Sequence, residues 1–396
     1  MSVPIFLSQQ TIFENAAYAV LEPTKAQELA RFANWVADSE LLRLSAEKLH
    51  LETFSSSPEW GKTFPADAFA EELNKLYLLI ALDAIRQLRT IHTERGIPEA
   101  VTRYTATTLS NSARRYAEYN SGKLGLEDWV LRYWFNVVAS GNLYRLGRME
   151  FIWEPFEPAI RVYRHRQTGQ VQALAEEGVN FTDEGYQPFA IREEEIRHYG
   201  WSLDEREVWT TRLLTNEIQV TGTPISPLGY ALRQEITLFL ADWELIFRQG
   251  DSVLEMHIPN YAPLTLDLLK DSFAQALNFF PRYHPERPFR AFSCNSWIFN
   301  TQWVDMLPPT SNVLAFQRQG YLFPIPSDGL EGTYFLFGTW LIDLDKAPQD
   351  TTLRRSVIQH FKRGGKLRTG GFFLLPNEVA KFGEEPYQKF PSNPQQ

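Results

Sequence analysis

The chain has 396 residues, of which 44% are hydrophobic and 14% aromatic, and its formal net charge is −9. This length favours two domains, and the apolar content is enough for sizeable cores and excludes a disordered chain. The acidic balance disfavours nucleic acid and anionic membranes as partners. Cys294 is the only cysteine, which excludes an internal disulfide and cysteine-based zinc sites, and the histidines lack metal-ligand spacing.

The N-terminal residues carry no targeting signal that we recognise. Residues 1–10 lack the positive start and long apolar run of a signal peptide. No run of about 18 apolar residues occurs, so we expect no membrane-spanning helix. We therefore expect a soluble, cytoplasmic protein, and the sequence does not indicate its oligomeric state.

The first 140 residues have the periodicity of helices. One helix is predicted from Asp67, a suitable N-cap, to His92, with apolar residues at three- and four-residue spacings. Its end is marked by Gly96 and Pro98, and a second helix is predicted from Pro98 to Tyr119. A third is predicted over residues 126–140. We therefore assign residues 1–150 to a helical N-terminal domain.

The period changes to that of strands after Gly141. Residues 146–153 read as extended, and two short strands at 160–163 and 171–174 flank a hairpin turn at 167–170. The acid-rich segment 183–207 is predicted to be a solvated face or loop, with an acidic docking patch as the alternative.

From about residue 216 strands and helices alternate. Strands are predicted at 235–240, 252–257, 290–293, 312–317 and 333–342. Helices are predicted at 266–280, with Thr265 as N-cap, at 301–307 and at 353–362. We expect 252–257 and 290–294 to be neighbouring parallel strands joined by the first of these helices. The predicted fold class is α+β with two domains: the helical bundle, then a mixed-sheet α/β domain over 151–345, with residues 346–396 as a C-terminal extension.

Several short motifs resemble those of one protein family. Leu143–Arg148 resembles the end of the helical N-terminal domain of bacterial N-acyltransferases, and Pro224–Pro227 resembles the entry to the GNAT-like domain that follows it. Three further segments fit the same family: Gly250–Pro259, Cys294–Trp297 and Ser311–Val313. The resemblance covers about residues 20–345 and implies an acyltransferase of the GNAT type in the C-terminal half.

The resemblance also implies a co-substrate, acyl-CoA or acetyl-CoA. In GNAT folds the cofactor lies where two parallel strands part, and its pyrophosphate meets backbone amides where the first strand turns into its helix. Here strand 252–257, the loop to Leu264 and the helix from Thr265 take that place, with 290–293 as the second strand. The candidate cofactor-binding residues are Asn260, Tyr261, Ala262, Leu264, Thr265, Asn295, Lys366 and Arg368.

The loop departs from the usual glycine-rich pattern. It contains Pro259 and Pro263 and no glycine, and proline has no amide hydrogen for a phosphate. Three options therefore stay open: CoA held in another way, a different acyl carrier, or no donor.

Three residues are candidates for the chemistry of acyl transfer. His257, at the end of the first strand, is a candidate base, because histidine titrates near neutrality. Cys294 is a candidate nucleophile if a neighbour lowers its pKa. Ser296, with Asn295, is placed to hydrogen-bond the thioester. The structural alternatives are a histidine bonded to the following loop, a buried apolar cysteine and a Ser296 that caps the next helix.

The C-terminal segment has a local excess of positive charge. Residues 351–370 hold six basic residues and no acidic one (Arg354, Arg355, Lys362, Arg363, Lys366, Arg368). A solvated basic helix is one interpretation. In the other, Lys366 and Arg368, on a glycine-flanked turn, supply charge to the phosphates of an anionic cofactor.

We therefore expect an N-acyltransferase that moves an acyl group from a thioester donor to a small-molecule or peptide amine. The alternative is a non-catalytic GNAT-like protein that binds a ligand or partner in its cleft. The pairing of strands 252–257 and 290–294 separates the two: strands that part favour the enzyme, and strands paired along their whole length favour the binding protein.

Overall fold

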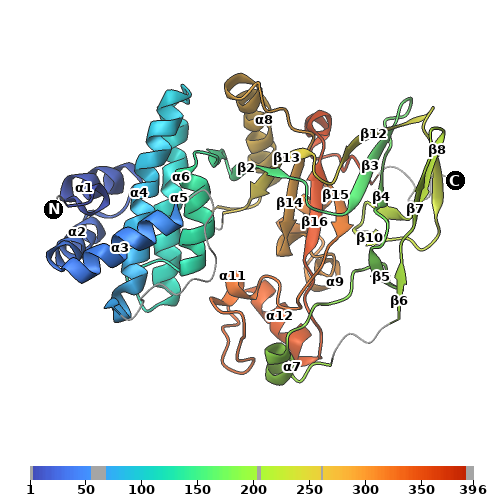
Figure 1. Cartoon of the computed structure of the whole chain (residues 1–396). Coiled ribbons are helices and arrows are strands. Elements are labelled where there is room, and N and C mark those ends of the chain that lie inside the picture. Colours follow the sequence, from blue (N-terminus) through green and yellow to red (C-terminus); the bar gives the residue numbers. More distant parts are fainter. Residues whose placement is uncertain (1–2, 55–67, 203–206, 260–261, 389–396) are drawn as a thin grey trace. The chain divides into compact units, whose positions relative to one another are not determined.

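The computed structural model describes residues 3–54, 68–202, 207–259 and 262–388 of the chain. The chain forms two compact units (Figure 1). The first comprises residues 1–152 with 258–261, and the second comprises residues 153–257 and 262–396. The chain passes from one to the other within strand β2 (Met149–Pro155).

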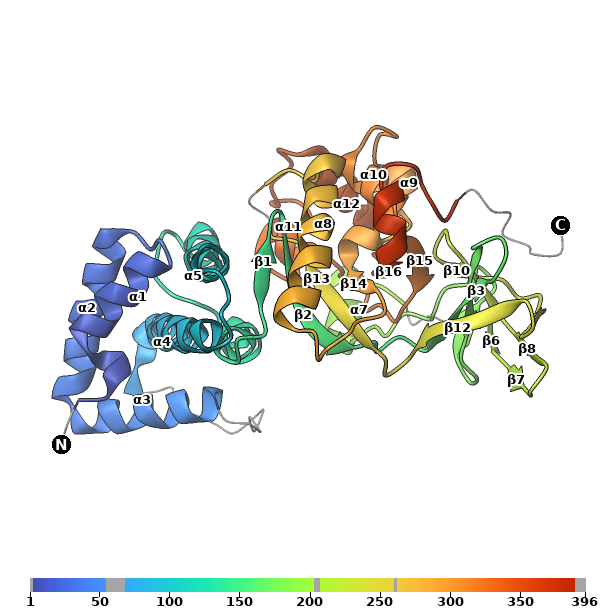
Figure 2. The ribbon, with the colours of Figure 1, turned by 90° about the horizontal axis from the view of Figure 1, so that it is seen from above.

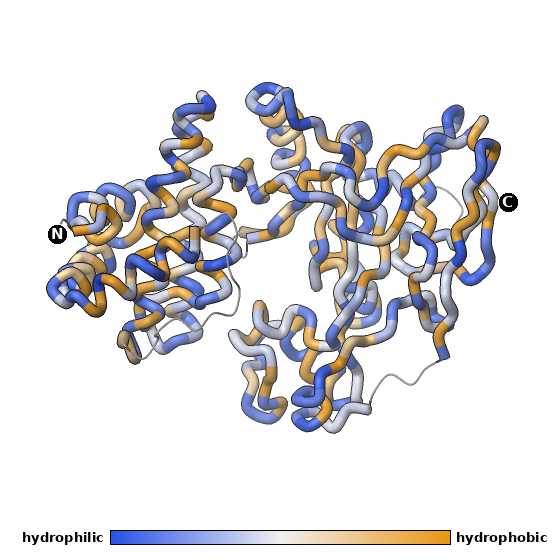
Figure 3. Tube along the Cα trace, in the orientation of Figure 1, coloured by the Kyte–Doolittle hydropathy of each residue, from blue (hydrophilic) through white to orange (hydrophobic). Residues whose placement is uncertain are grey.

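The first unit is a helical bundle built around α4 (Leu73–Glu94). Every residue from Leu76 to Ile85 is buried, which places this helix in the centre of the core. The surrounding helices carry both hydrophobic and hydrophilic residues along their length (Figure 3), as amphipathic helices on a core do. They are α1 (Gln9–Tyr18), α2 (Pro23–Asp38), α3 (Glu40–Thr53), α5 (Glu99–Tyr119) and α6 (Asn136–Ala139), which continues a π-helical segment (Val130–Phe135).

The predicted helices of this unit are present, and most of their observed ends lie within a few residues of the predicted ones. α5 begins directly after Pro98 and ends at Tyr119. Asp67, the predicted N-cap of the central helix, lies outside the described residues, and the prediction is wrong at this end, because α4 begins only at Leu73 with Glu72 as its N-cap, after a 3-10 turn (Ala70–Glu72). After α6 the chain forms the antiparallel hairpin of β1 (Tyr144–Leu146) and β2, which turns at Gly147 (φ 59°). No helix in the described part of the chain is long and apolar enough to cross a membrane.

The second unit contains two main sheets. In the central sheet the strands lie in the order β2-β13-β14-β16-β15, with β13 (Ser252–His257), β14 (Phe292–Ser296), β15 (Tyr321–Pro324) and β16 (Gly370–Leu374). The other has the order β10-β9-β4-β3-β12, with β3 (Ile160–His165), β4 (Val171–Ala175), β9 (Pro224–Ser226), β10 (Tyr230–Ala231) and β12 (Trp243–Arg248). Smaller sheets join β11 (Ile236–Phe239), β8 (Gln219–Gly222) and β7 (Leu213–Thr215), and β5 (Asn180–Thr182) with β6 (Val208–Thr210).

The parallel pair predicted from the sequence is confirmed. β13 and β14 are neighbouring parallel strands, and α8 (Leu266–Tyr283) connects them. α8 covers one face of these strands (Figure 2), where Phe273 contacts Phe292 with ring centroids 4.9 Å apart. Antiparallel β3 and β4 confirm the predicted hairpin.

Two predicted strands are helices instead. Residues 312–317 form α10 (Asn312–Gln317), and the Ser311 hydroxyl accepts the N–H of Val313 at 3.3 Å. Residues 333–337 form α11 (Thr333–Phe337), and no strand follows it up to Ile342. These apolar runs are too short for periodicity to distinguish a strand from a buried helix. Because Ser311 satisfies a first-turn amide of α10, it favours the helix.

The segment 346–396 contributes α12 (Thr352–Lys362), as predicted, and the inner strand β16. β16 is antiparallel to both β14 and β15. Gly364 ends α12 with φ 79°, as the predicted C-terminal turn requires. Gly370 and Gly371 are strand residues rather than part of that turn. A Cβ at Gly370 would meet the backbone of Phe299, and one at Gly371 would meet the Phe323 ring, so these neighbours admit only glycine.

The acid-rich segment is partly helical. It contains α7 (Glu193–Tyr199), whose N-cap residue Arg192 pairs with the buried Glu195 at 2.7 Å. At least this part of the segment is therefore structural, because a buried carboxylate needs its partner.

Candidate functional site

β13 and β14 part toward their carboxyl ends. Their ladder pairs are Leu254–Phe292 and Glu255–Ser293. In the described part of the chain, Met256 and His257 have no further ladder partner on β14, while 294–296 pair with β16 on the other side. The ladder therefore ends at the place that the GNAT resemblance implies, and we call the region beyond its last pair the opening; His257 is the last residue of β13 there, and Cys294 follows the last paired residue of β14.

The two faces of this opening differ in chemistry. Because side chains alternate along a strand, Cys294 shares the face of Phe292, which α8 covers. Glu255 and His257 lie on the opposite face of β13, together with Ser293, the partner of Glu255. The ionisable groups of β13 therefore lie away from the helix layer.

Glu255 is the residue that sequence analysis missed. Burial raises the pKa of its carboxyl to about 7, and the neighbouring carboxylates of Glu154 and Glu157 raise it further in the same direction. Such a group exchanges a proton near neutral pH, which suits a general base. The only signal in the sequence is one acid among the apolar residues of this strand, Val253, Leu254 and Met256. Its pKa depends on residues about 100 positions away, and no local pattern shows that.

His257 and Cys294 lie at the opening but titrate in unfavourable directions. Burial lowers the pKa of His257 to about 4, so its imidazole is neutral at pH 7 and is a weak base. Burial raises the pKa of the Cys294 thiol, and the Glu255 carboxylate adds to the increase. A thiol held in its neutral form is a poor nucleophile.

The two residues that follow Cys294 differ in their exposure. Asn295 is exposed. The Ser296 hydroxyl accepts the N–H of Ile298 at 3.3 Å and so caps the 3-10 turn η5 (Trp297–Phe299). The capping alternative for Ser296 is therefore observed.

The N-terminus of α8 is suited to an anion. Thr265 is the N-cap residue by position, but its side chain makes no capping hydrogen bond. The first-turn amides of an 18-residue helix are thus not satisfied by that side chain, and the helix dipole favours negative charge there. Ala262 and Leu264, which precede it, are half-buried. Asn260 and Tyr261 lie outside the described residues.

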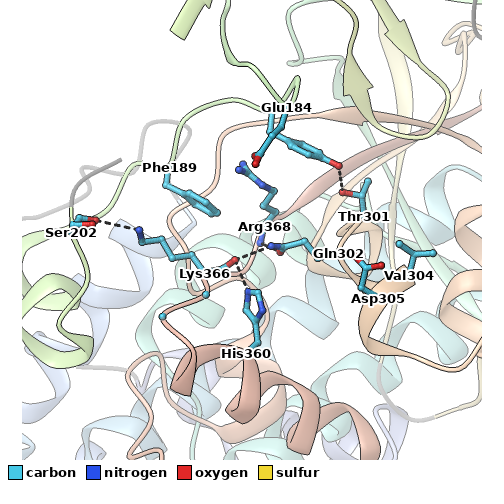
Figure 4. Close-up of a pocket in the computed structure, with 13 residues that line it drawn as sticks. Glu184, Phe189, Ser202, Thr301, Gln302, Val304, Asp305, His360, Lys366 and Arg368 are labelled. Atoms are coloured by element: carbon cyan, nitrogen blue, oxygen red, sulfur yellow. Dashed lines mark hydrogen bonds between the residues drawn. The ribbon is translucent and has the colours of Figure 1, made fainter. Parts of the chain in front are cut away.

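Lys366 and Arg368 lie together in a pocket of about 740 Å³ in the second unit (Figure 4). The Arg368 guanidinium lies 4.5 Å from the ring centre of Tyr186 and 4.2 Å from that of Phe189. The Lys366 ammonium donates to the Ser202 carbonyl at 3.2 Å. The pocket is lined by residues of three segments: 184–202, 301–305 and 360–368.

The described residues contain no cluster of three or more His, Cys, Asp or Glu side chains that would hold a metal ion.

Comparison with known families agrees with this architecture. The N-acyltransferase N-terminal domain matches residues 14–136, and the GNAT-like C-terminal domain matches residues 143–374. The second match covers more than half of the chain, so the chain belongs to the family with this GNAT-like domain, and the resemblance found in the sequence is confirmed. No curated protein matches the chain.

Solved structures of acyltransferases share the fold. One is a mutant in complex with octanoyl-CoA, 18% identical, with a TM-score of 0.57 over 92% of this chain and 88% of that chain. A second is in complex with decanoyl-CoA and teicoplanin, 18% identical, with a TM-score of 0.56 over 91% and 86%. A third is in complex with CoA and 10C-teicoplanin, 19% identical, with a TM-score of 0.56 over 92% and 87%.

Proposed function

We propose that this protein transfers an acyl group from acyl-CoA to an amine, in the opening between β13 and β14. The observation that carries the proposal is the open end of the parallel pair with Glu255 beside it, at its last ladder pair. The solved acyltransferases of the same fold bind octanoyl-CoA or decanoyl-CoA, and we extend a medium-length acyl donor to this chain. An enzyme that uses CoA thioesters works where they are made, so we place it in the cytoplasm.

The residues present fit the CoA thioester in two places. The edge of β13 beyond its last ladder pair with β14 faces the ligand with backbone groups that suit its amides, and the N-terminus of α8 offers amides and a dipole to its phosphates. Pro263 removes one amide from the approach to that helix, so the helix end rather than the loop carries this role.

We propose Glu255 as the group that moves protons. An ammonium acceptor loses one proton to the Glu255 carboxylate, which passes it to solvent. The free amine then attacks the thioester carbonyl carbon, the carbon–sulfur bond breaks, and a second nitrogen proton goes to the departing thiolate. We assign to Asn295, which is exposed at the end of β14, the role of donating a hydrogen bond during this step. The high pKa of Cys294 favours this direct route over a covalent one.

Calorimetric titration and thermal unfolding with decanoyl-CoA, acetyl-CoA and free CoA test the donor. A ligand present at 100 times its dissociation constant stabilises the folded state by about 2.7 kcal/mol. We expect decanoyl-CoA to stabilise the protein more than acetyl-CoA, and to release CoA when an amine is added. If no CoA thioester binds, the donor assignment is wrong. Binding without turnover over a broad amine panel would support the non-catalytic alternative.

A further inference from the structure

The pocket around Arg368 carries charges of both signs. Lys366 and Arg368 contribute two cations, and Glu184 and Asp305 contribute two carboxylates (Figure 4). His360 also lines it, but burial lowers the pKa of its imidazole, which keeps it neutral near pH 7. The side chain of Arg368 extends from beside Gln302 towards Glu184 (Figure 4). Such a lining matches a ligand that itself carries both signs of charge.

The frame of the pocket is fixed by hydrogen bonds. The Gln302 amide donates to the Lys366 carbonyl at 3.1 Å and accepts the N–H of Arg368 at 2.9 Å. The His360 Nε2 lies 3.1 Å from the same carbonyl oxygen. Arg368 itself is buried and donates to the Gln187 carbonyl at 3.0 Å. The cations are therefore held in place before a ligand arrives, which lowers the entropic cost of binding.

The pocket adjoins the carboxyl end of β14. Gly370 is the ladder partner of Ser296, the last residue of β14. Arg368 precedes Gly370 by two residues, so their Cα atoms are at most about 7 Å apart. Thr301 and Gln302, which also line the pocket, follow Ser296 through η5. Ligands of open α/β sheets bind outside the carboxyl ends of parallel strands, and β13 and β14 both end at this edge.

We propose that this pocket binds the acyl acceptor, and that the acceptor is a zwitterionic amine of the amino-acid or short-peptide class. Lys366 and Arg368 hold its carboxylate, and Glu184 and Asp305 favour its ammonium as it enters. The amine then lies toward the opening between β13 and β14. This inference rests on the proposed acyl transfer, for which it names the acceptor class.

The sequence analysis offered Lys366 and Arg368 as partners of the cofactor phosphates. Two features of the pocket argue against phosphates as its ligand. Glu184 and Asp305 would repel a ligand with several negative charges. In addition, none of the residues 262–265 before α8 lines the pocket. The volume of about 740 Å³ lies in the usual range for small-molecule sites.

The experiment uses the full-length protein, decanoyl-CoA and matched pairs of dipeptides, each with a free carboxylate or as its C-terminal amide. Initial rates are followed by CoA thiol release, and binding of each dipeptide without donor is followed by calorimetry at two salt concentrations. The variants are Lys366→Gln and Arg368→Gln. Lys362→Gln is the matched control, because Lys362 is on α12 and pairs with Asp345 at 2.8 Å, outside the pocket lining.

We expect free dipeptides to be used about 10- to 100-fold better than their amides, because charge-assisted hydrogen bonds to the carboxylate are lost in the amide. Lys366→Gln should remove most of this preference through the KM of the dipeptide, while leaving the KM of decanoyl-CoA unchanged. Lys362→Gln should behave as wild type. Arg368 is packed between aromatic rings, so Arg368→Gln is interpreted only if its circular dichroism spectrum matches that of wild type. If the spectra differ, the test rests on Lys366→Gln alone.

Three results would overturn the proposal. Equal rates with the free dipeptides and with their C-terminal amides would mean that the pocket does not recognise the carboxylate. A rise in the KM of decanoyl-CoA alone means that the cations hold cofactor phosphates. Failure of every dipeptide to bind in calorimetry removes the acceptor assignment even if decanoyl-CoA binds, whereas failure of decanoyl-CoA alone removes the proposed function and leaves dipeptide binding as a separate finding.

Discussion

Glu255 lies opposite Ser293 in the last ladder pair of β13 and β14 before the two strands part. This pairing places a carboxyl group with a pKa near 7 at the inner end of the opening. On the same face of the same strand, two residues further on, His257 has a pKa near 4. Burial raises the pKa of Glu255 and lowers that of His257. This difference decides which of the two residues can act as the base near pH 7.

The first prediction compares these two residues. If Glu255 is the base, the carboxylate form is needed, so kcat/KM should rise with pH through about 7 in wild type. Glu255→Gln should lower turnover by about 10²- to 10⁴-fold and remove that rise, while decanoyl-CoA still binds. If His257 is the base, the rise lies near pH 4 and His257→Gln causes the larger loss. An amine whose own pKa is far above 7 keeps acceptor ionisation from imitating the result.

The second prediction concerns Cys294. Under direct transfer, Cys294→Ala should change turnover by less than a few-fold, because the thiol is buried and its pKa is raised. A covalent route would make the same variant inactive and would leave an acylated protein visible by mass spectrometry of the intact chain with decanoyl-CoA. Cys294→Ser serves as the control for packing, since it keeps a similar volume without the thiol.

The third prediction tests the packing that holds the edge of the site. Gly371 pairs with Asn295 on β14, and a Cβ at this position would meet the ring of Phe323, which is buried. Gly371→Ala should therefore lower the free energy of unfolding by about 1–3 kcal/mol, as overpacked cores do. Urea unfolding measures the change. Gly178→Ala is a matched control for steric contact, because nothing lies within 4 Å of its Cβ, although its φ of 83° adds backbone strain of its own. Equal stability of Gly371→Ala and wild type would mean that the Phe323 ring moves aside.

Local sequence patterns were sufficient for the elements that frame the opening. β13 was predicted at its observed ends, since an apolar run bounded by Gly250 and Pro259 leaves few alternatives. α8 was predicted from Leu266 because its 3.6-residue periodicity is long. Two of the family motifs lie at the opening: Gly250–Pro259 contains β13, and Cys294–Trp297 contains the end of β14. The fold class and the parallel pair thus follow from information that is local along the chain.

Tertiary structure alone decided which strand residues pair and which charges meet. Gly370 and Gly371 belong to the glycine-flanked run that the sequence indicates to be a turn, and they become part of an inner strand only because β14 and β15 pair with it on both sides. Glu255 has its high pKa because the fold buries it near Glu154 and Glu157, and Arg368 meets Tyr186, Phe189 and Gln302 from two distant segments. Burial and electrostatic coupling depend on distance in space, so the sequence determined the frame of the site, and the fold determined its chemistry.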